Sequence, residues 1–397
     1  MMKLEDVCVL IADCPHSTAP DEGSGFPLIR TPNIGKGRLI LEGVHRVSAN
    51  VYHLRNKRAV PQDDDLIFAR EATAGNVAII KNGEKVCLGQ RTVLLRPNKE
   101  MVDPDFLVYY LLAPEQQYGL LGTANGATVA HVNIPTIRNL KISLPPLTAQ
   151  RKIAAIIKSY DDLIENNQNQ IKLLEEAAQR LYKEWFVDLR FPGHENTPIV
   201  DGVPEGWFSS TVSDFGDIIT GKTPSTSNSG YYGGKIPFVK IPDMHNTVYP
   251  ITTEVLLTKE GADTQKNKYI PRNSLMVSCI ATVGLVNIAV QECQTNQQIN
   301  SIILHNETDL YFLYFTLKQM TALLDGVGSN GATMTNVNKT KFGKIAVVCP
   351  TEEVRKDFFD WCAPVFQKIE ALSYNIVYLK EARDTLLPKL MNGEIEV

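Results

Sequence analysis

The stretch IAAIIKSYDDLIENNQNQIKLLEEAAQRLYKEW, residues 153–185, places apolar or aromatic side chains at alternating steps of four and three. This spacing is typical of a coiled-coil seam, in which one stripe of a helix faces a partner helix. Asn167 is the polar member of the seam; it suits control of register, and a solvated gap explains it equally well. We therefore predict a long helix from about residue 147 to about residue 186. Its predicted seam residues are Ile153, Ile157, Tyr160, Ile164, Asn167, Ile171, Leu174, Ala178, Leu181 and Trp185.

The same alternation returns near the end of the chain, with Arg383 as a charged interruption and with Pro364 expected to kink the helix or delay its start. Two such helices in one chain pair most simply as an antiparallel coiled coil, because a parallel pairing needs a long return connection. Antiparallel pairing would place the domains that precede the helices at opposite ends of a spacer. A plainer alternative is that the helices only dimerise the protein or fill a core. The second predicted seam is Phe358, Cys362, Val365, Ile369, Leu372, Ile376, Leu379, Arg383, Leu386 and Leu390.

Outside the helices the chain contains an internal repeat with a period of roughly 205 to 210 residues, which is the sequence signature of a duplicated architecture. The markers keep their order in the two copies, so chance is a poor explanation. In the first copy Asp103 and Pro104 predict the start of a short helix, as N-cap and first-turn residues. The matched stretches are 27–33 with 237–243, 72–75 with 281–284, Gln90 with Gln298, 106–111 with 312–317, and Asn125-Gly126-Ala127-Thr128 with the identical 330–333.

Each copy has a globular part rich in Gly, Pro, Thr and Asn, with short β-branched runs such as 77–80 and 302–303 that predict strands. The predicted fold class is α/β (α+β), with two similar domains, an antiparallel two-helix coiled coil and a pseudo-twofold internal repeat. The predicted segments are a first domain at 1–146, a first helix at 147–190, a linker at 191–204, a second domain at 205–350 and a second helix at 351–397.

Composition limits the possible functions. The chain has 397 residues, 44% of them apolar, and a net charge of -4, which argues against coating nucleic acid by bulk attraction but allows local basic loops. The first residues lack the apolar core of a secretory signal, and no apolar run approaches the roughly 18 residues of a membrane span. We expect a cytoplasmic protein without membrane contact. Seven scattered cysteines without a C-x-x-C pair predict reduced thiols and no metal site.

Three motifs resemble catalytic sites, and none has the flanking sequence that such a site needs. Residues 216–223, GDIITGKT, satisfy the P-loop pattern, but polar residues precede them and a turn sequence follows, so a strand at 215–219 entering a polar loop is the better interpretation. The stretch 103–106, DPDF, faintly resembles an adenine-methyltransferase motif, yet no glycine-rich loop for S-adenosylmethionine accompanies it. Cys14-Pro15-His16 lacks a second Cys/His pair at ligand spacing. We predict no catalytic residues.

Loops that mix cations, hydroxyls, amides and aromatic rings are the better candidates for function. Such side chains bond to phosphates and to base edges, and long loops reach into a groove of DNA. Each residue taken singly is also compatible with an ordinary solvated loop. The predicted DNA-binding residues are Arg30, Asn33, Lys36 and Arg38 in the first copy, and Lys222, Thr223, Ser225, Thr226, Asn228, Tyr231, Tyr232 and Lys240 in the second.

These features resemble the specificity subunits of type I restriction-modification systems. Residues 144–154, LPPLTAQRKIA, resemble the entry to the first long helix of that family, and 181–193, LYKEWFVDLRFPG, resemble its exit. Residues 221–225, GKTPS, and 236–243, IPFVKIPD, resemble the start of a target recognition domain. The resemblance spans nearly the whole chain and is weakest in the first domain.

The resemblance implies that each domain reads one half of a split, asymmetric target in double-stranded DNA, while the coiled coil sets the gap between the halves. It also implies two methyltransferase subunits, which bind S-adenosylmethionine, and restriction subunits that use ATP, so no cofactor is expected on this chain. Two other functions stay open at this point. One is a coiled-coil scaffold that never touches DNA, and the other is a P-loop NTPase that depends on Lys222.

Overall fold

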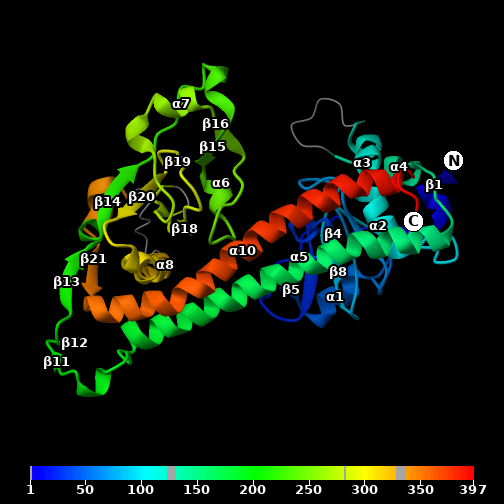
Figure 1. Ribbon diagram of the computed structural model, residues 1–397. Coiled ribbons are helices and arrows are strands. Elements are labelled where there is room, and N and C mark those ends of the chain that lie inside the picture. Colours follow the sequence, from blue (N-terminus) through cyan, green and yellow to red (C-terminus); the bar gives the residue numbers. More distant parts are fainter. Residues whose placement is uncertain (1, 123–130, 281–282, 328–336) are drawn as a thin grey trace. The chain divides into compact units, whose positions relative to one another are not determined.

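The computed structural model describes residues 2–122, 131–280, 283–327 and 337–397, and the chain divides into two units. Unit 1 contains residues 1–163 and 379–397, and unit 2 contains residues 164–378. The long helices α5 (Leu147–Tyr182) and α10 (Glu352–Met391) each contribute one segment to each unit. A π-helical turn, Lys183–Val187, extends α5 (Figure 1).

Unit 1 is built on a five-stranded sheet in the order β2-β9-β6-β7-β4, accompanied by a three-stranded sheet in the order β5-β3-β8. The strand β3 runs parallel to β8 and antiparallel to β5. The strands are β1 (Met2–Lys3), β2 (Cys8–Asp13), β3 (Phe26–Ile29), β4 (Gly37–Arg38), β5 (Arg46–Val47), β6 (Leu66–Ala69), β7 (Val77–Ile79), β8 (Cys87–Leu88), β9 (Thr92–Pro97) and β10 (Lys141–Ile142). The short helices are α1 (Ala49–Arg55), α2 (Pro104–Leu112), α3 (Pro114–Leu121) and α4 (Ile134–Arg138).

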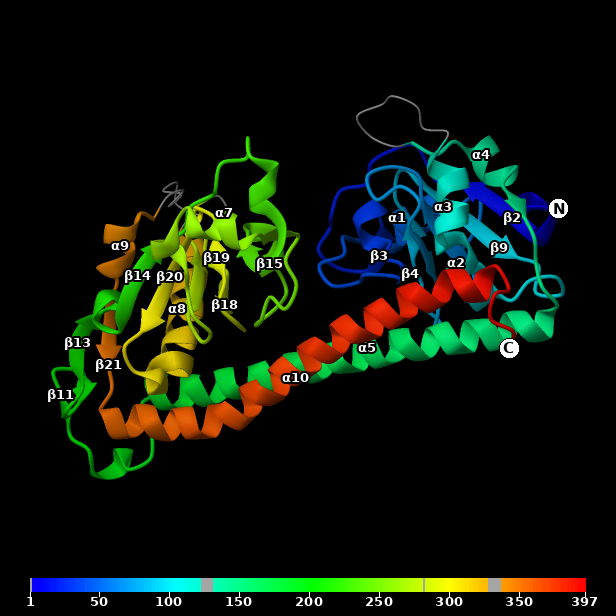
Figure 2. The ribbon, with the colours of Figure 1, turned by 45° about the horizontal axis from the view of Figure 1, so that its top comes forward.

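Unit 2 repeats this topology. Its main sheet has the order β14-β20-β17-β18, and its second sheet has the order β16-β15-β19, again with one parallel pair, β15 with β19 (Figure 2). The strands are β11 (Ile199–Val200), β12 (Val203–Pro204), β13 (Phe208–Thr211), β14 (Gly216–Thr220), β15 (Tyr232–Val239), β16 (Val255–Leu257), β17 (Leu275–Ser278), β18 (Val286–Ile288), β19 (Gln294–Thr295), β20 (Ile299–Leu304) and β21 (Ala346–Cys349). The short helices are α6 (Ile241–Met244), α7 (Lys259–Asp263), α8 (Leu310–Val327) and α9 (Lys339–Gly343).

The two units therefore share the order of four main-sheet strands and of the three-stranded sheet, while β4 has no counterpart among the described strands of unit 2. The duplication inferred from the repeat is confirmed. The predicted helix start is confirmed as well, since Asp103 caps α2 by accepting a hydrogen bond from the Phe106 backbone N–H. The predicted strands are confirmed: the run 77–80 forms β7, which ends at Ile79, and 302–303 lies within β20. The repeat markers Asn125-Gly126-Ala127-Thr128, Asn330-Gly331-Ala332-Thr333 and Ala281-Thr282 lie outside the described residues.

The long helices pair in antiparallel fashion within each unit. In unit 1, Ile153 and Ile157 near the start of α5 share a buried cluster with Leu387 and Leu390 near the end of α10. In unit 2, the pairing is between the end of α5 and the start of α10, where the Trp185 and Phe358 rings lie 5.8 Å apart. This confirms the predicted orientation of the coiled coil. Pro364 does not delay α10, which begins well before it at Glu352.

All of the predicted seam residues are buried or half-buried, so the seam pattern marks the covered faces of both helices. The seam pattern does not include every buried residue of the two helices. Asp161, Tyr182, Phe366 and Leu387 are buried although each stands one position away from the seam. These side chains are covered because the same helices also pack against the globular part of each unit, through α2 in unit 1 and α8 in unit 2.

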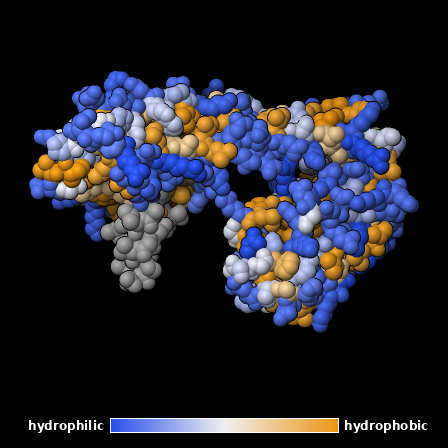
Figure 3. All heavy atoms as spheres, turned by 90° about the horizontal axis from the view of Figure 1, so that it is seen from below, coloured by the Kyte–Doolittle hydropathy of each residue, from blue (hydrophilic) through white to orange (hydrophobic). Residues whose placement is uncertain are grey.

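In each unit one buried cluster joins the main sheet to α2 or α8 and the long helices, and a second cluster joins the other face of the main sheet to the three-stranded sheet. Unit 2 has the larger aromatic content, with Phe312, Phe315, Phe358 and Phe366 in one buried cluster. On the face drawn in Figure 3, apolar residues form separate patches between hydrophilic ones. Among the described residues, no helix combines the length and hydropathy needed to cross a membrane.

Candidate nucleic-acid interface

A cation followed by a short helical turn occurs at the same place in both units. In unit 1 the backbone N–H of Arg30 donates to Asn33 Oδ1 over 3.2 Å, and in unit 2 the backbone N–H of Lys240 donates to Asp243 Oδ2 over 2.8 Å. Each turn follows the central strand of the three-stranded sheet. The repeated sequence therefore builds a repeated structure, a strand end that presents a cation immediately before a capped turn.

A second segment lies beside each cation because the central strand has a parallel neighbour. The Gly89 backbone N–H donates to Ile29 O over 2.7 Å in unit 1, and the Asn296 backbone N–H donates to Val239 O over 3.1 Å in unit 2. Ile29 and Val239 immediately precede Arg30 and Lys240. The segments that lead into β9 and β20 thus lie next to the two cations.

In unit 2 the polar loop after β14 joins this group. The Lys222 backbone N–H donates to Thr295 O over 2.9 Å, and Thr223 Oγ1 donates to Gln297 Oε1 over 2.8 Å. Three parts of the chain, the loop at 222–228, the cation Lys240 and the segment 295–298, are thereby held together. They combine cationic, hydroxyl and amide groups, the mixture that recognises phosphates and base edges.

The same geometry argues against a nucleotide-binding P-loop at 216–223. The Gly221 and Lys222 backbone N–H groups, which would have to face a phosphate, donate instead to Ile299 O and Thr295 O. The loop leads to a 3-10 turn, Ser229–Tyr231, and then to β15, so no helix N-terminus supports an anion there. The interpretation as a strand that enters a polar loop is confirmed, with β14 ending at Thr220.

Sequence matching of Gln90 to Gln298 was wrong by one residue. Cys14 and Gly221 each follow the edge strand of their main sheet, β2 and β14. The Cys14 backbone N–H donates to Thr92 O, and the Gly221 backbone N–H donates to Ile299 O. Counting back from Thr92 and Ile299 pairs Gln90 with Gln297. Both side chains also hold the loop after the edge strand, because Gln90 Nε2 donates to His16 O over 3.0 Å and Gln297 accepts from Thr223. The strand register identifies the pairing of Gln90 with Gln297, whereas the sequence repeat alone does not.

The remaining predicted residues of unit 2 differ in their exposure and in the hydrogen bonds that they form within the protein. Lys222, Ser225, Thr226 and Asn228 are exposed. The Tyr232 hydroxyl donates to Pro224 O over 2.8 Å, so its ring braces the loop instead of projecting from it. Ser225 Oγ bonds with Ser227 Oγ, and Asn228 Oδ1 accepts from the Gly230 backbone N–H. Tyr231 is half-buried beside α7, where its backbone oxygen accepts from the Thr258 backbone N–H.

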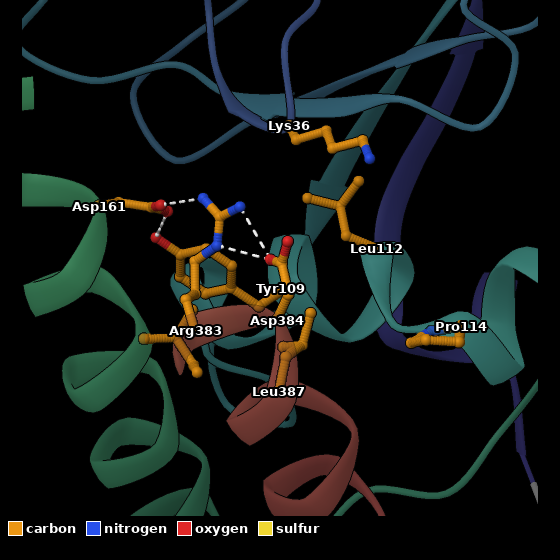
Figure 4. A pocket seen from close by; sticks show the side chains of 9 residues that line it. Lys36, Tyr109, Leu112, Pro114, Asp161, Arg383, Asp384 and Leu387 are labelled. Carbon is orange, nitrogen blue, oxygen red and sulfur yellow. Dashed lines mark hydrogen bonds and ion pairs between the residues drawn. The ribbon is translucent and has the colours of Figure 1, made fainter. Parts of the chain in front are cut away.

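Unit 1 distributes its predicted residues differently. Asn33 is only 5% exposed, and because its Oδ1 accepts from Arg30 while its Nδ2 donates to Ile40 O, it shapes the turn and is not a candidate for a base contact. Arg38 forms an ion pair with Asp162 of α5. Lys36 lines a cavity of about 250 Å³ beside α2, α5 and α10 (Figure 4). Arg30 is therefore the predicted cation of unit 1 that occupies the same position as Lys240.

Lys240 itself is held by an acidic neighbour. Its Nζ lies 2.7 Å from Glu254 Oε2, and the hydrogen bond and charge of Lys240 lower the pKa of the Glu254 carboxyl. The carboxylate is 68% exposed, so water screens this pair and the lysine can exchange it for another anion. The pair positions the ammonium group at the end of β15.

The chain is similar to known proteins along most of its length. The family model described as "Type I restriction modification DNA specificity domain" matches residues 1–176 and 204–370. The chain is 32% identical over 403 residues to the type I restriction enzyme HindI specificity subunit of Haemophilus influenzae, covering 85% of this chain and 88% of that one. It is 25% identical to the MjaIX specificity subunit of Methanocaldococcus jannaschii, covering 100% and 93%.

A solved structure shows a similar fold. The crystal structure of the S subunit of the type I restriction-modification system of M. genitalium aligns over 98% of this chain and 95% of that chain. The TM-score is 0.55 at 14% sequence identity. The matching fold agrees with the duplicated topology and the long helices described above.

Proposed function

The chain belongs to the type I restriction-modification DNA specificity family, and from that premise we propose that each of its two domains reads one half of a bipartite DNA target. The observation that carries the proposal is a cation with a neighbouring glutamine segment, an arrangement built on equivalent strands in both units. In one copy it presents Arg30 and Gln90, and in the other Lys240 and Gln297. Because the loops around these residues differ, we expect the two half-targets to differ, which gives an asymmetric site.

We further propose that the chain itself catalyses no reaction and binds no cofactor. In this proposal residues 1–146 and 205–350 are the two recognition domains, and the helices at 147–190 and 351–397 set the distance between half-targets. The helices also bind two methyltransferase subunits, which carry S-adenosylmethionine, and restriction subunits that use ATP join the complex. In support of this proposal, α5 and α10 each contribute one segment to both units.

A DNA-binding assay with the methyltransferase partner present tests the proposal as a whole. We expect retention of a duplex that carries the target found by methylation mapping, and weaker retention of an unrelated duplex of equal length. A scaffold that does not touch DNA would retain neither duplex.

Replacing Lys240 with alanine is expected to weaken DNA binding by similar amounts on target and unrelated duplexes, because an ammonium group at this position contacts phosphate and not a base. The slope of log affinity against log salt should become shallower by about one. Titrations at several salt concentrations measure both effects. Lys356→Ala is the matched control, since Lys356 is a lysine of α10 that pairs with Asp360. Unchanged binding by K240A at all salt concentrations would contradict the assignment.

Replacing Gln297 with alanine is expected to act differently, because an amide reads base edges. The loss should be roughly 1–3 kcal/mol on the target duplex and small on unrelated DNA. Gln291→Ala is the control, an exposed glutamine of the same unit. Competition titrations with the two duplexes measure the difference. Equal losses on both duplexes would show that Gln297 supports the loop and reads no base.

A further inference from the structure

A buried ionic group occupies the place where α2 meets both long helices in unit 1. The Tyr109 hydroxyl of α2 donates to Asp161 Oδ2 of α5 over 2.8 Å, and Arg383 Nη1 of α10 lies 2.6 Å from Asp161 Oδ1 (Figure 4). Asp161 is 7% exposed. Burial works against the charged form of Arg383, but its bonds and attraction to Asp161 and Asp384 outweigh that effect and raise its pKa. The carboxylate is thus buried with its partners in place.

The equivalent place in unit 2 can be identified from a second pair of contacts. In unit 1, the Asp103 backbone N–H at the start of α2 donates to Gln150 Oε1 of α5. In unit 2, Asp309 at the start of α8 pairs with Arg355 of α10. The first turns of α5 and α10 therefore contact the same point of the two domains. Counting forward from Gln150 and Arg355 makes Phe366 the counterpart of Asp161.

Unit 2 fills this place with apolar side chains. Phe366 packs against Phe315 of α8 with ring centroids 5.9 Å apart, and Phe315 is the counterpart of Tyr109 in the repeat. Ala178 of α5 has the same place in its seam as Arg383 has in the seam of α10. It belongs to the same buried cluster as Phe366. One unit thus has an ionic layer and the other an apolar layer, although the surrounding fold is the same.

This difference bears on which helices can pair. The amino-terminal half of the chain carries Asp161 and Ala178, and the carboxy-terminal half carries Phe366 and Arg383. In the native pairing Asp161 meets Arg383. If α5 paired with α5 of a second copy, Asp161 would face Ala178 and be buried without a cation. If α10 paired with α10 of a second copy, Arg383 would face Phe366 and lose the buried carboxylate of Asp161, keeping only the exposed Asp384 of its own helix.

We propose that the Tyr109–Asp161–Arg383 layer makes the two halves of the chain pair with each other and rejects pairing of either half with a second copy of itself. Removing one member of a buried ion pair is strongly destabilising, because it leaves an uncompensated charge in the interior. Pairing of α5 with itself suffers this penalty in full, because Asp161 is left without a cation. Pairing of α10 with itself deprives Arg383 of its buried partner and leaves it the exposed Asp384, whereas the native pairing keeps both contacts. Specificity arises from the cost of the competing states, whether or not the ion pair adds net stability to the native one.

The test uses the complete chain cut after folding. A protease site is inserted at the exposed turn Asp201-Gly202, and the chain is expressed with light and heavy isotopes. The cut proteins are mixed in denaturant and refolded by dilution. Native mass spectrometry then measures the ratio of two kinds of pair. Amino–carboxy pairs contain one amino-terminal and one carboxy-terminal half, and the other pairs contain two identical halves. For the wild type we expect amino–carboxy pairs to exceed pairs of identical halves by at least about tenfold.

The variant Tyr109→Phe with Asp161→Phe and Arg383→Ala copies the layer of unit 2 into unit 1. We expect it to lose most of the preference, so that pairs of two identical halves appear. Its matched control is Lys356→Ala with Asp360→Ala, which removes an exposed ion pair within α10 and should keep the wild-type ratio. A variant that keeps the full preference for amino–carboxy pairs would overturn the proposal.

A second variant covers the case in which the first does not refold. Asp161→Arg with Arg383→Asp reverses the pair and should refold into amino–carboxy pairs. When it is mixed with the wild type, halves from the two proteins would bring like charges together. We expect such mixed pairs to be at least about tenfold rarer than matched ones. Mixed and matched pairs in equal amounts would overturn the proposal, as would identical-half pairs from the wild type.

Discussion

Exchanging residues 205–350 for the corresponding domain of another specificity subunit is expected to change one half of the methylated DNA sequence and to leave the other half and the gap unchanged. The main sheet, the three-stranded sheet and the loop at 222–228 of unit 2 all lie within this segment. The long helices lie outside it. Genome-wide mapping of methylated adenine, in a strain that expresses the chimera with its methyltransferase partner, measures the outcome.

The graft must respect the contacts that α8 makes with α10. Phe312 and Phe315 share the buried cluster of Phe358 and Phe366, and Asp309 pairs with Arg355. A donor domain with matching residues at these positions should therefore be chosen. Exchange of residues 1–146 is the reciprocal control and should change only the other half-sequence. Alteration of both halves by a single exchange, or of neither, would contradict the modular proposal.

Replacing Phe358 with alanine is expected to lower the free energy of unfolding by about 3–5 kcal/mol, the usual cost of removing a phenylalanine ring from a packed core. Phe358 is fully buried near the start of α10. Its ring lies close to those of Tyr182, Trp185, Phe186 and Phe315, with centroid separations between 5.0 and 6.4 Å. The mutation leaves a cavity where the two long helices and α8 meet.

Trp361→Ala is the matched control for this prediction. Trp361 lies one turn further along α10 and is 41% exposed, so its loss should cost clearly less than the loss of Phe358. Denaturant unfolding followed by circular dichroism compares the two variants, with the midpoint and the slope reported separately because a two-unit protein can unfold in more than one step. Equal destabilisation by the two replacements would show that the aromatic cluster is not the main support of the helix pair.

Much of the fold could be predicted because its signals are periodic or repeated. The alternation from Ile153 to Trp185 and from Phe358 to Leu390 marks two helices with apolar stripes, and the antiparallel pairing follows from two such helices in one chain. The repeat of residues 27–33 at 237–243 predicts two similar domains, and both stretches form a strand followed by a capped turn. The start of α2 at Asp103 is predicted by local capping chemistry alone.

The candidate interface was predictable only in outline. Composition identifies polar loops, yet it cannot say which polar atoms are already bonded within the protein. Asn33 and Tyr232 are engaged in turns and loops, and Arg38 pairs with α5, whereas Lys222 remains exposed. The match of Gln90 to Gln297 depends on strand register, which a one-residue offset in the sequence repeat conceals.

The amino-acid sequence by itself determined the duplication, the two long helices and the family to which the chain belongs, because periodicity and repeated motifs are written along the chain. Only the tertiary structure decided which side chains share a layer. Asp161 and Phe366 stand one position off the seam, and each is buried by a helix from its own globular domain. Contacts between residues far apart in the chain leave no periodic trace, so Asp161 meets Arg383 only once the chain has folded.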